Sequence, residues 1–263
     1  MSTDCMKAIE GYRTRIDACL NKILPPSRRE PAILHRAMRY SVFSGGKRLR
    51  PIVVLISGNI FGIEEAEIMP VACGIELMHN FSLIHDDLPA MDNDDFRRGK
   101  KTCHRKFGEA VAILAGDALL AFAFRAIASV NNSSLTVAAA EAIGSEGMAG
   151  GQAYDIESKD RKISAAFKQE IDGLKTGRLF QLCFSVPFFF RKIDRRERDR
   201  INRISNNFGM AFQARDDIED KEGDVSYSRK WLGVLYRRLK KDIAFFKERG
   251  TLLASLVDTL YDI

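Results

Sequence analysis

The strongest constraint on the fold is that little in this sequence would interrupt an α-helix. The chain has 263 residues but only seven prolines, and helix-favouring residues such as Ala, Leu, Lys and Glu are abundant throughout. No segment alternates apolar and polar residues between hairpin turns, as a half-buried strand would. The sequence therefore predicts an all-α protein without β-strands.

Turn signals divide the chain into about ten expected helices. Residues 25–27 (Pro-Pro-Ser), 44–46 (Ser-Gly-Gly) and 131–134 (Asn-Asn-Ser-Ser) end three of them. The segments around 71–85 and 111–124 are apolar nearly all round, which is typical of helices buried inside a large bundle. We expect helices over residues 4–21, 30–42, 49–58, 64–87, 105–129, 134–154, 164–188, 193–221, 231–248 and 250–261.

Size and composition fit one globular domain. A chain of this length can bury roughly 70–75% of its unfolded surface, and its 46% hydrophobic and 29% charged residues are ordinary for a globular protein. The net charge of +6 is spread along the chain, so we interpret most of it as a solvated surface. Basic and aromatic residues do not interleave, and we expect no nucleic-acid partner.

Cysteines and apolar runs bear on the cellular location. The five cysteines are widely spaced without a Cys-x-x-Cys motif, which favours reduced thiols in a cytoplasmic protein over disulfides or a zinc site. The N-terminus lacks a basic start followed by an apolar core, so no signal peptide is expected. The longest apolar stretches, 110–115 and 118–123, are broken by Gly116-Asp117, and we therefore expect no membrane span.

The more specific of two acidic clusters spans residues 85–92, His-Asp-Asp-Leu-Pro-Ala-Met-Asp. His79 and Asp86 are seven residues apart and so project from one helix face. Pro89 breaks the helix, and Asp92 must then fold back from the loop to join Asp86. Facing carboxylates cannot all stay ionised without cations between them, and Mg²⁺ prefers carboxylate and phosphate oxygens. The cluster therefore predicts a metal site that binds a phosphorylated ligand.

The second acidic cluster lies inside an expected helix and contains Asp216, Asp217 and Asp220. Asp216 and Asp220 are four residues apart and share a face, and Gln213 precedes Asp217 by four on the same side. Like charges at this spacing repel, so the sequence either exposes them to water or places them on a metal. By composition alone, a solvated helix face is as good an interpretation as a set of metal ligands.

Basic motifs that could hold phosphate occur at three places. Arg97 and Arg98 follow the first cluster, and guanidinium groups bind phosphate through paired hydrogen bonds. Residues 44–51 read Ser-Gly-Gly-Lys-Arg-Leu-Arg-Pro, where the glycines let a ligand approach the backbone ahead of a helix N-terminus. Taken alone, residues 44–51 fit an ordinary basic turn better than a phosphate site. Residues 175–178 (Lys-Thr-Gly-Arg) are ambiguous in the same way, and their alternative interpretation is a polar interruption of an apolar helix. Neither a Gly-x-Ser-x-Gly elbow nor a Walker loop occurs, so covalent catalysis is not indicated.

Taken together, the motifs resemble those of the trans-isoprenyl diphosphate synthases (polyprenyl synthetase family), and among them the bacterial farnesyl diphosphate synthases. They occur in the family's order over roughly residues 35–225, which makes the resemblance highly specific. The matching motifs are residues 45–51, His79 with Asp86, Asp87 and Asp92, Arg97-Arg98-Gly99, Gly116-Asp117, Gly151-Gln152, Lys175-Thr176-Gly177, and Gln213 with residues 216–220.

The resemblance implies a fold and an activity. The fold would be a single domain over residues 1–263, a bundle of about ten mostly antiparallel helices around a central cavity, in a homodimer. The activity would be a Mg²⁺-dependent condensation of isopentenyl diphosphate with an allylic diphosphate by ionisation, condensation and elimination. Three Mg²⁺ ions would lie between the two clusters and bind the allylic diphosphate. The implied metal ligands are Asp86, Asp87, Asp92, Asp216, Asp217 and Asp220.

The resemblance also implies roles for the basic and polar residues. By this analogy, the residues that stabilise the departing diphosphate are Arg97, Lys175 and Lys230. Those that flank the carbocation left behind are Lys175, Thr176 and Gln213. Those that hold isopentenyl diphosphate are Lys47, Arg50, His79 and Arg98. The released diphosphate would take the final proton, so no protein nucleophile is required.

Product length depends on Phe81, five residues before Asp86. Family members with an aromatic residue there and the two extra residues Pro89-Ala90 resemble makers of C15 products, so we expect (2E,6E)-farnesyl diphosphate. The alternative for Phe81 is simple core packing. Alternatives for the whole chain are a geranyl or geranylgeranyl diphosphate synthase, a non-catalytic subunit of a heteromeric prenyl synthase, a terpene cyclase, or a helical scaffold with incidental acidic patches.

The sequence departs from the family pattern after about residue 224. Lys230 falls at the position of the first lysine of a loop that covers the diphosphates in the family, but the following stretch is shorter by about fifteen residues. Such a loop excludes water from the active site. The resemblance therefore leaves open how this site closes.

Overall fold

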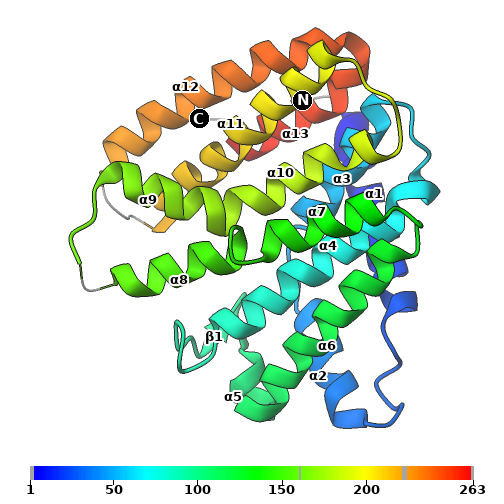
Figure 1. The fold of residues 1–263 in the computed structure, drawn as a ribbon, viewed down its shortest axis with the longest axis vertical. Helices are drawn as coiled ribbons and strands as arrows, with labels where there is room; N and C mark the ends of the chain where they lie inside the picture. Colours follow the sequence, from blue (N-terminus) through cyan, green and yellow to red (C-terminus); the bar gives the residue numbers. More distant parts are fainter. Residues whose placement is uncertain (1–2, 160, 221–223, 262–263) are drawn as a thin grey trace.

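The computed structural model describes residues 3–159, 161–220 and 224–261, and most of them are helical. Figure 1 shows long helices packed side by side in one bundle, so the expected all-α class is confirmed. A π-helical turn, Gly173–Gly177, joins α9 to α10, and 3-10 turns over Val186–Phe189 and Ala244–Gly250 follow α10 and α12. The α-helices are α1 (Thr3–Ile23), α2 (Ala32–Val42), α3 (Leu49–Ile60), α4 (Glu65–Asp86), α5 (Cys103–Phe107), α6 (Glu109–Ala128), α7 (Ser133–Ile143), α8 (Met148–Ser158), α9 (Ala165–Asp172), α10 (Arg178–Ser185), α11 (Arg195–Asp220), α12 (Val225–Ile243) and α13 (Thr251–Tyr261).

The expectation of no β-strand is wrong at one place. Strands β1 (Phe96–Arg97) and β2 (Lys100–Lys101) form a two-stranded antiparallel hairpin. Arg98 and Gly99 connect them with φ angles of 53° and 72°, the positive values that a tight hairpin turn requires. Strands of two residues are too short to produce the alternation that identifies a strand in a sequence.

Two of the expected long helices are divided at glycines. Gly108, with φ of 88°, separates α5 from α6, where one helix over 105–129 was expected. Gly144 and Gly147 separate α7 from α8, where one helix over 134–154 was expected. A side chain at Gly147 would clash with backbone oxygens near the end of α7. The break between α7 and α8 therefore depends on a residue without Cβ.

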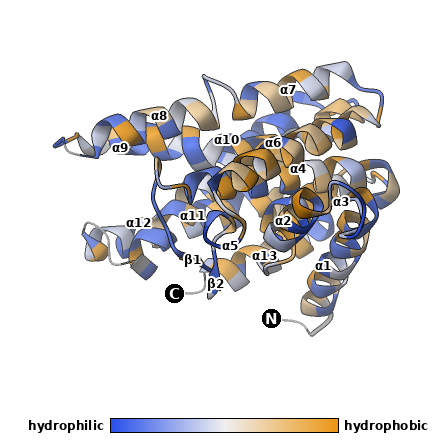
Figure 2. Ribbon diagram, turned by 90° about the horizontal axis from the view of Figure 1, so that it is seen from below, coloured by the Kyte–Doolittle hydropathy of each residue, from blue (hydrophilic) through white to orange (hydrophobic). Residues whose placement is uncertain are grey.

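Helix α4 is the core element of the bundle and makes its most extensive contact with α6. Residues from Val71 to Met78 are buried, and Figure 2 shows α4 and α6 as mostly hydrophobic at the centre of the molecule. Gly74 permits close approach, since a Cβ there would lie 2.7 Å from Cγ1 of Ile127 and 2.9 Å from the carbonyl oxygen of Ala123. Packing on all sides fixes α4, and with it the acidic residues at its C-terminal end.

Among the described residues, α6 is the one helix long and apolar enough to cross a membrane by length and composition alone. The expectation from broken apolar runs overlooked it, because a single Gly116-Asp117 pair does not make the helix polar. In the structure α6 packs along α4 and α2, as a core helix of a bundle does. Its remaining face exposes Ile113 and Leu114, which are 44% and 56% accessible.

The guanidinium of Arg48 ties four elements together in the interior. Arg48 precedes α3 with a left-handed φ of 51°. It donates hydrogen bonds to Asp17 of α1 at 2.7 Å, to Glu76 of α4 at 2.9 Å and to the carbonyl of Val42 at the end of α2 at 2.6 Å. The side chains of Arg48 and Glu76 are only 2% and 3% exposed. A buried charge is tolerated when it is paired and hydrogen-bonded, so this Arg48 hub fixes the basic segment that leads into α3.

We expect Arg48→Met to lower the free energy of unfolding by about 3–5 kcal/mol, because it leaves the Glu76 carboxylate buried without its cation. Urea unfolding measures the change. The matched control is Arg15→Met, which removes a second Arg–Glu pair between α1 and α4 whose partners are 51% and 33% exposed; it should cost about 0–1 kcal/mol. Equal losses in the two variants would contradict the hub.

Candidate active site

The first acidic cluster lies at the C-terminal end of α4, where the helix ends at Asp86. The following loop turns back, and the amide of Asp92 donates to the carbonyl of Asp86 at 2.9 Å. The expected return of Asp92 to Asp86 is therefore confirmed. Lys159, just after α8, fastens this loop by donating to the carbonyl of Met91 and to the carboxylate of Asp92, both at 3.0 Å.

The carboxyl of Asp86 is half-buried beside other charges. Burial raises the pKa of Asp86 to about 6, with Asp92 raising it further while Lys175 opposes the shift. Burial by itself would lower the pKa of Lys175, but its hydrogen bond with Asp155 and the charges of Asp86 and Asp92 leave it raised. Lys175, Asp86 and Asp92 thus share one electrostatic environment.

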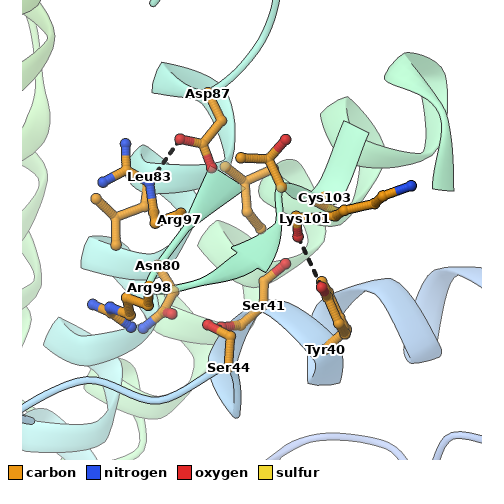
Figure 3. A pocket seen from close by; sticks show the side chains of 12 residues that line it. Tyr40, Ser41, Ser44, Asn80, Leu83, Asp87, Arg97, Arg98, Lys101 and Cys103 are labelled. Carbon is orange, nitrogen blue, oxygen red and sulfur yellow. Dashed lines mark hydrogen bonds and ion pairs between the residues drawn. The ribbon is translucent and has the colours of Figure 1, made fainter. Parts of the chain in front are cut away.

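Asp87 points into a separate small pocket beneath the hairpin. Its carboxylate is buried and accepts a hydrogen bond from Nε of Arg97 at 2.6 Å (Figure 3). Figure 3 also shows Arg98 in this pocket and the hydroxyl of Tyr40 donating to the Lys101 carbonyl, a bond of 2.8 Å. In this arrangement Asp87 holds Arg97 in place, while Asp86 and Asp92 face Lys175.

A cluster of cationic side chains surrounds His79 on α4. The guanidinium of Arg50 lies 3.2 Å from Nε2 of His79 and 4.7 Å from the ring centre of Phe180 in α10. Burial lowers the pKa of His79 well below its ordinary value, and Arg50, Arg98, Arg97 and Arg48 lower it further, so its ring is neutral at pH 7. Arg50 beside this neutral imidazole, with Arg98 nearby, forms a surface suited to a diphosphate.

Gly46 makes room for one of these cations. Its φ is 121°, and a Cβ there would lie 2.6 Å from Nη1 of Arg98. That nitrogen donates to the carbonyl of Gly45 at 2.5 Å. The Gly-Gly pair is therefore required where the Arg98 side chain crosses the loop. Neighbouring Lys47 is exposed at the same loop.

Lys175 and Thr176 lie in the π-helical turn between α9 and α10. The ammonium group of Lys175 donates to Asp155 of α8 at 2.6 Å. Helix α8 comes this close because Gly151 has no side chain: a Cβ there would lie 2.5 Å from the backbone nitrogen of Lys175. Next to it, both amide atoms of buried Gln152 lack a hydrogen-bond partner among the described residues. π-turns are frequent at functional sites, and an unpartnered buried amide is suited to a ligand.

The second cluster lies near the C-terminal end of α11. The amide of Gln213 donates to Asp217 at 3.1 Å, so their expected common face is confirmed. Asp217 also lies 3.6 Å from Lys168 of α9, and the charge of Asp216 acts on Arg50. The side chain of Asp220 lies outside the described part of the chain.

Side chains of α9 and the π-turn connect the two clusters. Burial raises the pKa of Asp172 to about 6, and its charged neighbours are Lys168, Asp217, Asp155 and Lys175. Asp172 thus lies near both Asp217 of α11 and Lys175, the lysine that interacts with the first cluster. These residues form one charged region. A cavity of about 590 Å³ adjoins it between α9, α10, α11 and α12. Its lining includes Lys168, Asp172, Gln213, Asp217 and Trp231.

No group of three or more His, Cys, Asp or Glu side chains within the described ranges forms a ready-made metal site. The carboxylates are paired with lysines instead: Asp92 with Lys159, and Asp217 with Lys168. This donor set still fits Mg²⁺, which keeps several waters and binds through one or two carboxylates plus substrate phosphates. The sequence analysis did not predict Lys159, Lys168, Asp155 or Asp172 as site residues. Each is a single charge on a polar helix and belongs to no recognisable motif.

One predicted site residue, Lys230, lies in a different kind of element than expected. Lys230 is a helix residue and not a loop residue, because Asp224 caps α12 by accepting a hydrogen bond from the amide of Tyr227 at 3.0 Å. Phe81 packs its ring edge-on against His85, with centroids 5.3 Å apart. His85 in turn lies 3.2 Å from the carbonyl of Ile113 in α6. The contact of Phe81 is thus on the α6 side of α4; its role in product length stays a prediction.

The chain is similar to known proteins in sequence and in fold. Residues 31–234 match the Polyprenyl synthetase family. Farnesyl diphosphate synthase of Geobacillus stearothermophilus is 43% identical over 201 residues, 73% of this chain and 68% of that protein. Large subunit 1 of the chloroplastic heterodimeric geranylgeranyl pyrophosphate synthase of Arabidopsis thaliana is 39% identical over 244 residues, 88% of this chain and 64% of that protein. An apo FPP/GFPP synthase from Zymomonas mobilis has a TM-score of 0.92 and 31% identity, covering 99% of this chain and 100% of that chain.

The chain therefore belongs to the polyprenyl synthetase family, and its fold is that of the isoprenoid synthases. Its class of activity is prenyl transfer. The family is generally Mg²⁺-dependent and uses isopentenyl diphosphate with allylic diphosphate substrates.

Without divalent metal, we expect the contribution of Asp86 and Asp172 to the stability of the protein to fall as pH rises from about 4 to about 7. The folded-state pKa of Asp86 and of Asp172 is about 6, against an ordinary value of 3.8 for aspartate, so the folded chain binds protons that the unfolded chain has released. Asp86→Asn removes one of these buried charges. The variant should exceed the wild type by about 1–3 kcal/mol at pH 8 and match it at pH 4.

Urea unfolding with a chelator present, at both pH values, measures this difference. Asp199→Asn, which removes a carboxylate that is 53% exposed, is the control and should change the stability by less than about 0.5 kcal/mol. A stabilisation of Asp86→Asn that is the same at pH 4 and pH 8 would be at odds with a buried carboxylate.

Proposed function

We propose that this chain condenses isopentenyl diphosphate with dimethylallyl or geranyl diphosphate and forms (2E,6E)-farnesyl diphosphate. One observation carries the proposal: on α4, the cationic cluster around His79 lies two helical turns before Asp86, and the charges of Asp86 and Asp92 act on Lys175. Two adjacent sites of opposite charge suit two diphosphates, one bound directly by arginines and one bound through metal. Several relatives named farnesyl diphosphate synthase support the C15 product.

The carboxylates would hold the allylic diphosphate through Mg²⁺, with three ions expected. In this proposal Asp86 and Asp92 would hold the ions from one side and Asp216 and Asp217 from the other, while Asp87 positions Arg97. Bound Mg²⁺ would supply positive charge to the diphosphate as its carbon–oxygen bond breaks. The bonds from Lys159 and Lys168 to these carboxylates would then give way, which frees two ammonium groups at the site.

The remaining residues would act on the organic part of the reaction. Arg50, Arg98, Lys47 and His79 would fix isopentenyl diphosphate with its double bond toward the allylic carbon. The π-turn that holds Thr176 gives backbone carbonyls beside the developing carbocation. Donors and dipoles fixed in advance are the largest contribution in catalysis of this kind. The diphosphate that leaves is the base for the final proton.

A second copy of the chain would cover the apolar face of α6 and α7. Ile113 and Leu114 of α6 and Val137 of α7 are exposed there, and the two helices contact each other. We propose a homodimer through this face. Sedimentation analysis of the purified chain tests it, and a monomer at micromolar concentration would count against it.

The proposed reaction is tested by incubating the purified chain with labelled isopentenyl diphosphate and each allylic diphosphate, with Mg²⁺ or with chelator. We expect Mg²⁺-dependent C15 product. Asp216→Asn should lower kcat at least about 100-fold, the scale of losing one preorganised charge-stabilising group. Glu219→Gln is the control, because this neighbouring carboxylate is exposed and bonded to Arg215 at 2.6 Å; it should retain wild-type turnover. A folded protein without turnover would favour the non-catalytic subunit.

Product length is tested by Phe81→Ala in the same assay. If Phe81 limits the cavity, the smaller residue should shift the main product from C15 to C20, as read by chromatography of the dephosphorylated alcohols. Geranylgeranyl pyrophosphate synthases match this chain to a similar degree, so a C20 product of the wild type is the alternative. An unchanged C15 product in Phe81→Ala would assign Phe81 to packing against His85.

A further inference from the structure

Two arginines at the start of α3 are stabilised in opposite ways. Arg48 is paired with the carboxylates of Asp17 and Glu76. Arg50, two residues later, forms no ion pair with any residue that the structure describes, and its buried Nε atom has no hydrogen-bond partner there. Its Nη1 atom lies 3.2 Å from Nε2 of His79. A buried cation without a carboxylate is costly unless another group stabilises its charge.

The ring face of Phe180 in α10 lies against the Arg50 guanidinium. Cζ of Arg50 is 4.7 Å from the centre of this ring, and Phe180 is fully buried. An aromatic face attracts a cation, and it does so most strongly where water is excluded. The other neighbour, the imidazole of His79, is neutral at pH 7 because of its lowered pKa. Both groups are uncharged, so they stabilise the guanidinium without neutralising it.

Further aromatic residues hold the ring of Phe180 in place. Phe208 and Phe212 of α11 contact it, with ring centres 5.1 Å and 5.2 Å away and interplanar angles of 61° and 52°. Phe208 also contacts Tyr261 in the last turn of α13, and the Tyr261 hydroxyl donates to the Phe208 carbonyl at 3.2 Å. Tilted and edge-to-face contacts of this kind favour particular ring orientations. The face that Phe180 presents to Arg50 is therefore fixed by α11 and α13.

We propose that Phe180 is a positioning residue for diphosphate binding, which holds the Arg50 guanidinium in place through its ring face. Arg50 keeps its charge for the ligand because neither of its two supports is a carboxylate. This assignment rests on the proposed function, in which Arg50 binds the diphosphate of isopentenyl diphosphate. Phe180 itself makes no contact with substrate in this role. It belongs to none of the sequence motifs, because its contact with Arg50 joins α10 to α3.

The test compares Phe180→Leu with Phe184→Leu in the full-length chain. Both phenylalanines are fully buried in α10 and contact Phe208, but Arg50 lies over the ring of Phe180 and not over that of Phe184. The two variants should lose similar stability in urea unfolding. Phe180→Leu alone should raise the KM for isopentenyl diphosphate about 2- to 30-fold while kcat stays near the wild-type value. Calorimetric titration with isopentenyl diphosphate and a chelator should show the same loss of affinity.

Ring fluorination is a second test that leaves the shape of the side chain nearly unchanged. Fluorine withdraws electron density from the ring face, so phenylalanines with one, two and three fluorines at position 180 should weaken the binding of isopentenyl diphosphate stepwise. The same series at position 184 should leave binding unchanged.

Two results would overturn the positioning role and leave the proposed function intact. One is an equal rise in KM for Phe180→Leu and Phe184→Leu, and the other is an affinity that does not respond to fluorination at position 180. A wild-type chain that binds neither isopentenyl diphosphate nor inorganic pyrophosphate, with or without Mg²⁺, would instead overturn the proposed function and this assignment together.

Discussion

The structure depends on one buried ion pair, between Arg48 and Glu76. Desolvating two charges is costly, and it is tolerated here because the guanidinium also bonds Asp17 and the end of α2. The hub sets the position of the loop before α3 relative to α4. That relation places Arg50 and Arg98 around His79 on α4. An ion pair outside the site therefore determines the geometry of the cationic half of the site.

In the acidic half of the site, lysine side chains balance the charge of several carboxylates. Lysines from three segments contact its carboxylates: Lys159 on Asp92, Lys168 on Asp217 and Lys175 on Asp155. Such half-exposed pairs are individually weak, about 0–1 kcal/mol. Carboxylates held by weak pairs can exchange a lysine for a divalent cation at little cost. The site thus combines a cationic half with fixed side chains and an acidic half whose ion pairs can be exchanged.

The sequence predicted the positions of the acidic side chains better than those of the residues around them. Helical spacing predicted that Asp92 returns to Asp86 and that Gln213 shares a face with Asp217, and both are confirmed. It did not predict that Asp87 turns away to bind Arg97, because neighbouring residues of a helix end can point into different pockets. It placed Lys230 in a loop because the family resemblance puts a loop lysine there, whereas Asp224 caps α12 and makes Lys230 a helix residue.

By itself, the sequence determined the helical class, most turn positions and the residue types available for phosphate and metal, because periodicity and breakers act over a few residues. Only the tertiary structure decided which charges meet. The close approach of α8 at Gly151 and the pairing of lysines with carboxylates join residues distant in the chain. Such contacts arise from the packing of whole helices, which local patterns do not encode.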